Sequence, residues 1–136
     1  MDGGENKVNS HYTFMKRDME LVRLILLGQE TGETPPELSE YSKETIIYHY
    51  QIMDDAGLIV AWAAKDISGI AHGGGVNRLT WAGHDFLDST KDSKIWKMAK
   101  EHIIRPGASW TFSLLMEWLK QQAHQQAFGV PPQQLK

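Results

Sequence analysis

One stretch of the sequence, Thr45 to Trp62 (TIIYHYQIMDDAGLIVAW), constrains the fold more than any other, because its hydrophobic period changes partway along. The first half predicts a helix with Ser42 as its N-cap and a buried stripe formed by Ile46, Tyr50 and Met53. A glycine then ends the helix, and the LIVAWAA that follows has the composition of a strand. Each of these elements has an apolar face, so other elements of the same domain must cover both.

A second strand and a helix are expected after this stretch. The segment VNRLTW returns as the second strand of a hairpin. The intervening KDISGIAHGGG predicts a flexible tip, because Gly69 and the three glycines at 73–75 lie within it. Thr80 is placed to cap the next helix, WAGHDFLDST. The buried residues of that helix are expected to be Trp81, Phe86 and Leu87, or a subset of them.

Three more helices are predicted outside this central region. The first spans Lys16 to about Leu27, carries one apolar face and stops at Gly28. The second spans about Asp92 to Ile104, with lysines on the face opposite its apolar residues. The third begins at Thr111, after an Arg-Pro-Gly break, and contains several aromatic residues.

The predicted order of elements is helix, loop, helix, strand, strand, helix and then two further helices. This order is typical of a winged-helix domain, so the predicted fold is mainly α (α+β), with a β-hairpin wing and a two-helix C-terminal extension. The predicted organisation is a flexible tail over 1–14, the winged-helix domain over 15–90, a helical extension packed on the core over 91–128, and a flexible tail over 129–136.

Several segments together resemble a family of bacterial and phage hypothetical proteins, domain of unknown function 2513. The resemblance extends from Met15 to about Phe128, and residues 1–14 precede the point at which the family usually begins. It implies a winged-helix fold and no established activity. The segments that carry it are MKRDMELVRLILL, YSKETIIYHYQIMDDAGLI, RLTWAGHDFLD, DSKIWKMAKEHI and GASWTFSLLMEWL.

Charge is unevenly distributed along the 136 residues. The span 15–90 holds six basic and twelve acidic side chains, whereas 91–136 holds seven basic and three acidic ones. There is no cysteine, which excludes disulfides and thiolate chemistry and fits a cytoplasmic location. No apolar run approaches the roughly 20 residues of a membrane span, so no membrane association is expected.

The first functional hypothesis is binding of double-stranded DNA by a regulator of the phage or mobile-element type. In a winged helix, the exposed face of the second main helix enters the major groove and the hairpin contacts the backbone. The residues expected to serve this role are Lys43, Tyr48, Gln51, Lys65 and Arg78. The nearby acidic side chains Glu44, Asp54 and Asp55 oppose it, because affinity for DNA depends on neutralising phosphates.

The alternative hypothesis is a winged-helix module for protein–protein interaction or dimerisation that does not bind DNA. The acidity of the core favours this alternative, whereas the base rate for winged helices favours DNA. The residues expected at a partner or dimer interface are Ile47, Tyr48, Trp110, Phe112 and Trp118.

The motifs predict no enzyme, and they indicate no metal, cofactor or small-molecule substrate. The six histidines include no H-E-x-x-H pair, and the glycines at 73–75 lack the Lys-Ser/Thr that completes a phosphate loop. His49 is expected to be partly buried and to hydrogen-bond the backbone. His84 is likewise expected to have a structural role.

Overall fold

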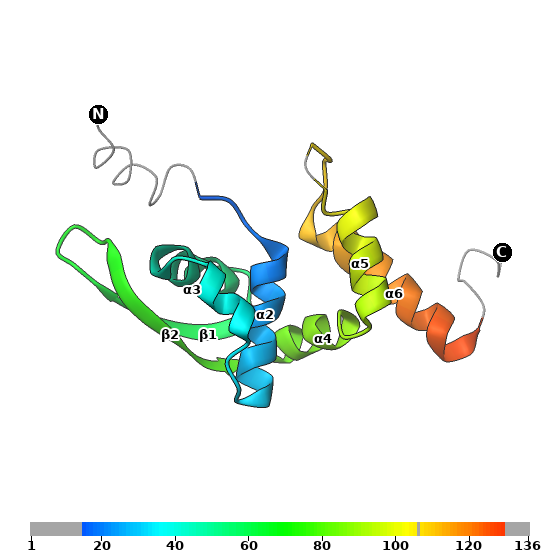
Figure 1. The fold of residues 1–136 in the computed structure, drawn as a ribbon, viewed down its shortest axis with the longest axis horizontal. Coiled ribbons are helices and arrows are strands. Elements are labelled where there is room, and N and C mark those ends of the chain that lie inside the picture. The colour runs from blue at the N-terminus through cyan, green and yellow to red at the C-terminus, as the bar shows by residue number, and fades with distance from the viewer. Residues whose placement is uncertain (1–14, 106, 130–136) are drawn as a thin grey trace. The chain divides into compact units, whose positions relative to one another are not determined.

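The computed structural model describes residues 15–105 and 107–129, which form two compact units, one ending at His84 and one beginning at Asp85. The described chain is a mixed α+β structure with five α-helices, one 3-10 helix and a two-stranded antiparallel sheet (Figure 1). Apart from Gly129, the predicted terminal tails lie outside the described residues. The elements are α2 (Met19–Thr31), η1 (Pro36–Glu40), α3 (Lys43–Asp55), β1 (Ile59–Lys65), β2 (Ala71–Leu79), α4 (Trp81–Ser89), α5 (Ser93–His102) and α6 (Phe112–Phe128).

Helix α2 begins and ends later than predicted. Asp18 caps the start of the helix, because its carboxylate accepts hydrogen bonds from the backbone N–H groups of Glu20 and Leu21. The prediction that Gly28 ends the helix was wrong: the helix continues to Thr31 and is capped by Gly32, whose φ of 77° suits a glycine. Gly28 instead leaves room for the following loop, since a Cβ there would meet the Pro35 ring at 2.9 Å. The predicted apolar face is confirmed as buried at Met19, Leu21, Val22, Ile25 and Leu26.

Helix α3 has the predicted boundaries. The Ser42 hydroxyl oxygen accepts the backbone N–H three residues later at 3.1 Å. At the other end, Gly57 has a φ of 78°, and the backbone N–H of Leu58 donates to the Met53 carbonyl at 3.0 Å. This is a Schellman motif, which turns the chain directly into β1.

The predicted buried stripe of α3 was wrong for two of its three residues. Met53 is buried, but it is accompanied by Ile47 and His49, whereas Ile46 and Tyr50 are only half-buried. Ile46 and Tyr50 lie on the side of α3 that faces the hairpin, where they line a hollow with the backbone of β2. Because β2 is rich in glycine at this point, it has few side chains to cover them.

The three consecutive glycines lie in a strand and not at the hairpin tip, so their predicted position was wrong. Residues 73, 74 and 75 pair with Ala64, Ala63 and Trp62 of β1. The two sides of the sheet need these glycines for different reasons. A Cβ on Gly74 would approach the Tyr50 ring, while a Cβ on Gly75 would meet the Trp62 indole nitrogen at 2.7 Å. Glycine therefore lets α3 approach one face of the hairpin and lets Trp62 lie flat on the other.

The hairpin base, defined here as Gly57, Leu58, Thr80 and Gly83, connects the two strands to the flanking helices. As predicted, Thr80 caps α4, since its hydroxyl oxygen accepts the Gly83 N–H at 3.0 Å. The same hydroxyl donates to the Gly57 carbonyl, and the Thr80 N–H donates to the Leu58 carbonyl at 3.0 Å. Any Cβ on Gly83 would overlap the Leu58 carbonyl oxygen, so α4 can begin here only with glycine at this position.

The second unit has its own core of aromatic and aliphatic side chains, with α5 and α6 lying side by side (Figure 1). Phe86 is buried and contacts the rings of Trp96 and Phe112, with centroids 6.2 Å and 5.2 Å away. Thr111 caps α6 as predicted. Asp92 caps α5 and also accepts a hydrogen bond from the Gln126 amide at 2.9 Å, which connects the start of α5 to the end of α6.

Candidate binding surfaces on α3 and the hairpin

The outer face of α3, directed away from His49 and Met53, is acidic. Glu44, Asp54 and Asp55 are exposed on this helix, and the partly exposed Tyr48 and Gln51 lie between them. Lys43 is exposed but stands alone, because it is the only basic residue of the helix and occupies its first position. The predicted residues Lys43, Tyr48 and Gln51 are therefore accessible, within a surface of predominantly negative charge.

The placement of Ile47 on the exposed face was wrong. Ile47 is 5% exposed and belongs to the core. The error follows from the register of the stripe, because the apolar arc of α3 is wide enough to include Ile47 as well as His49 and Met53. Ile47 consequently has almost no surface to offer a partner.

The two predicted cations of the hairpin lie far apart along it. Lys65 is the last residue of β1, near the tip, whereas Arg78 pairs with Val60 near the base. These positions are five residue steps apart along β1, which corresponds to roughly 17 Å in a strand. The Arg78 guanidinium also donates to the Leu79 carbonyl at 3.3 Å. The hairpin therefore does not gather these two charges into one basic patch.

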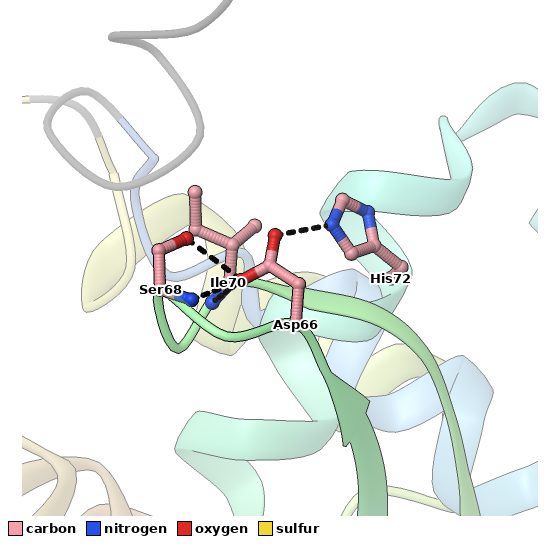
Figure 2. Close-up of polar contacts among 4 residues, drawn as sticks. All are labelled: Asp66, Ser68, Ile70 and His72. Carbon is pink, nitrogen blue, oxygen red and sulfur yellow. Dashed lines mark hydrogen bonds and ion pairs between the residues drawn. The ribbon is translucent and has the colours of Figure 1, made fainter.

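A carboxylate shapes the hairpin tip, defined here as residues 66–72, and Figure 2 shows its contacts. One oxygen of Asp66 accepts hydrogen bonds from the Ser68 N–H, the Ser68 hydroxyl and the Ile70 N–H, at 2.7 to 3.0 Å. The other oxygen lies 2.7 Å from His72 Nε2. The Ser68 hydroxyl and His72 lower the pKa of Asp66, so the carboxylate stays ionised and the turn stays formed at neutral pH. The turn holds Ile67 fully exposed.

His49 is a buried polar residue that connects α3 to the start of α2. Its Nε2 accepts the Asp18 N–H at 2.9 Å, and its Nδ1 lies 2.9 Å from the Thr45 carbonyl, to which it donates. These partners fix one neutral tautomer, because a second proton on Nε2 would leave the Asp18 N–H without its acceptor. Burial lowers the pKa of His49. The prediction of a backbone-bonded histidine is confirmed, and both partners are structural.

The partner of Asp18 on the loop before α3 was not predictable from the sequence. Tyr41 hydrogen-bonds the Asp18 side chain, and partial burial together with that carboxylate raises the pKa of Tyr41 to about 12. Asp18 therefore interacts with α2 through its cap, with Tyr41 through its carboxylate and with His49 through its N–H. The residues are 23 to 31 positions apart, and neither spacing nor motif connects them in the sequence.

A groove between α3 and β1 is the second feature that sequence analysis missed. It has a volume of about 580 Å³ and is lined by Gln51, Asp54, Asp55, Ala61, Trp62, Ala63 and Lys65. Trp62 is 52% exposed. The groove combines carboxylates from the last turn of a helix with the backbone of a strand, so only the folded chain creates it.

The aromatic residues predicted at an interface in the second unit, Trp110, Phe112 and Trp118, are each half-buried. Phe112 packs on Phe86 within that unit, so much of its ring already serves the local core. Their role toward a partner stays a prediction. Within residues 15–105 and 107–129, no cluster of three His, Asp or Glu side chains is arranged to hold a metal ion. In the same residues, no helix combines the length and the apolar character needed to cross a bilayer.

Comparisons with known proteins identify the family. No solved structure matches the chain. An uncharacterized protein of Haemophilus influenzae strain Rd is 33% identical over 96 residues, which cover 65% of this chain and 79% of that relative. A family model described as hypothetical protein (DUF2513) matches residues 16–109, most of the chain. The protein therefore belongs to the family of hypothetical proteins defined by domain of unknown function 2513.

Proposed function

We propose that this protein is a winged-helix binding module whose partner is another protein. The order of α2, α3, β1, β2 and α4 supports the winged-helix assignment, since the hairpin follows the second long helix and returns to a further helix. In this assignment, α3 takes the place of the helix that reads DNA in winged-helix regulators, and the hairpin takes the place of the wing.

The negative charge of α3 favours a protein partner over DNA. A helix that enters the major groove lies between two rows of phosphates, and each unneutralised carboxylate near them weakens binding. The exposed surface of α3 carries three carboxylates, from Glu44, Asp54 and Asp55, against the single ammonium of Lys43. A protein surface can complement this charge distribution, whereas a phosphate backbone cannot.

DNA binding is the second candidate function, and the exposed cations support it. Lys43, Lys65 and Arg78 are all exposed on the first unit, and Gln51 is accessible on α3. In this mode α3 would present Lys43 and Gln51 to base edges, while the hairpin cations contact phosphates. The protein would then act as a transcriptional regulator.

A titration of labelled random duplex DNA, followed by fluorescence anisotropy at low salt, separates the two functions. For a protein-binding module we expect no binding, and Lys43→Glu should change nothing. Binding that weakens steeply as salt rises, and that Lys43→Glu weakens further, would replace the protein partner with DNA. The matched control is Lys120→Glu, which makes the same charge change at an exposed position of α6.

A further inference from the structure

One edge of β1 has backbone groups with no strand to pair with. β1 pairs with β2 on one side, and no other strand of the described chain pairs with its second side. The Trp62 carbonyl points toward β2, because a Cβ on Gly74 would meet that oxygen at 2.9 Å. Backbone groups of successive residues alternate between the two edges of a strand. The N–H and C=O of Ala61 and Ala63 therefore point to the unpaired edge.

The groove between α3 and β1 lies along this same edge. Ala61 and Ala63 both line it, and its volume of about 580 Å³ falls within the roughly 300–1,000 Å³ typical of binding sites. The outward N–H and C=O groups offer an extended chain the hydrogen bonds of a further strand. Because α3 forms the opposite wall, the groove admits a single strand and not an open-ended stack of sheet edges.

The wall formed by α3 gives the groove a negative charge. Asp54 and Asp55 lie in the last turn of α3, which has no basic residue, and these two carboxylates outnumber Lys65, the one basic side chain that lines the groove with them. The negative end of the helix dipole adds to these two charges. A ligand that enters this groove is therefore stabilised by positive side chains near the α3 wall.

We propose that the groove between α3 and β1 binds an extended peptide segment of a partner protein as a third strand on β1, with a Lys or Arg side chain opposite Asp54 and Asp55. This proposal rests on the proposed function, because it takes the partner to be a protein. The main-chain hydrogen bonds of Ala61 and Ala63 supply affinity, and the two carboxylates supply preference for a basic sequence.

Selection of short random peptides displayed on phage, with the full-length chain as the immobilised target, tests the proposal. Enriched peptides should carry Lys or Arg, and their synthetic versions should bind in a fluorescence anisotropy titration. Asp54→Lys/Asp55→Lys should weaken their affinity by about tenfold or more. Glu40→Lys/Glu44→Lys is the matched control, since it makes the same charge change at two exposed carboxylates that do not line the groove, and it should have little effect.

A second variant tests the strand edge separately from the charge. Ala63→Pro removes an outward N–H without removing a hydrogen bond to β2, and an edge position of this kind tolerates proline. It should abolish peptide binding while the thermal unfolding curve stays cooperative. On adding peptide to the unmodified chain, the Ala61 and Ala63 amides should become protected from hydrogen exchange.

Three results would overturn the groove proposal: no enrichment over an unrelated protein, enrichment of acidic peptides, or binding that both variants leave unchanged. These results would not bring the proposed function down with it, because a protein partner could still use another surface. Salt-sensitive binding of DNA would instead overturn the proposed function, so the two failures are distinguishable.

Discussion

The hairpin base and the hairpin tip are both held by side chains that bond the backbone, but they differ in what surrounds those bonds. At the base, Thr80 connects β2 to the start of β1 and the backbone of α4 is in close contact with Leu58. At the tip, Asp66 makes four polar contacts, yet its carboxylate, Ser68 and His72 are all exposed to water.

Because of this difference, the contacts at the base contribute to the stability of the fold, whereas the contacts at the tip determine only the local conformation. Water competes for every hydrogen bond at the tip, so the tip contacts select a conformation without contributing much to the free energy of unfolding. The base is tightly packed, because a Cβ added at Gly83 would overlap the backbone of Leu58. The contact of α2 with α3 through His49 resembles the base, because His49 is buried and both of its ring nitrogens are hydrogen-bonded. Water therefore competes little for these bonds.

The largest expected effect is at the base. Gly83→Ala places a Cβ against the Leu58 carbonyl, and relief requires α4 to move away from β1. We expect a loss of about 3 kcal/mol in the free energy of unfolding, the upper end of the usual cost of overpacking, measured by urea denaturation. Gly73→Ala is the matched control, because its Cβ would make an ordinary contact of 3.8 Å with Ala64. Equal losses in the free energy of unfolding for both substitutions would show that the base is no more tightly packed than β2.

A smaller, pH-dependent effect is expected at His49. His49→Gln leaves the part-buried Asp18 N–H without its ring acceptor, which should cost about 1–3 kcal/mol at pH 7.5. Burial lowers the pKa of His49 below 6.5, its ordinary value, so below pH 6.5 the unfolded chain binds the proton first. The stabilisation is therefore complete above 6.5 and declines as pH falls toward the folded-state pKa.

Urea denaturation at several pH values checks the expected sign. The difference between the unmodified chain and His49→Gln should shrink on acidification from pH 7.5 to 5.5. His72→Gln, which alters the exposed histidine of the tip, serves as the comparison and should change the free energy of unfolding less. A difference that grows with acidification would mean that His49 is protonated in the folded state.

The smallest effect on stability is expected at the tip. Asp66→Ala removes the acceptor of the Ser68 and Ile70 N–H groups, so the exchange of these two amides should accelerate while the global unfolding curve is unchanged. Asp66→Asn keeps an acceptor oxygen at the same position and should preserve most of the protection. A marked fall in global stability with Asp66→Ala would show that the tip resembles the base.

The caps were predictable because they depend on residues close in sequence. Ser42, Thr80 and Thr111 each bond a backbone N–H three residues later, and Gly57 adopts the positive φ expected of a helix-ending glycine. The strands after Gly57 were also predicted, although β2 begins earlier than VNRLTW because it includes the glycines.

Which face of a helix is buried was harder to predict than where the helix begins and ends. A stripe of apolar residues on α3 fits more than one rotation of the helix, and the partners on α2 and the hairpin decide among them. Tyr50 is half-exposed because the glycines of β2 leave few side chains to cover that side of α3, whereas Ile47 is interior. The pairing register, which places residues 73–75 opposite Trp62, Ala63 and Ala64, was not readable from the segment itself.

By itself, the sequence determined the family, the order of helices and strands, the caps and the uneven charge, since each depends on residue identity or on neighbours a few positions away. Only the tertiary structure decided the His49–Asp18 connection, the contact at Gly83 and the acidic groove beside β1. These features join residues that are distant in the chain, and their positions follow from how helices and strands pack, which local chemistry does not specify.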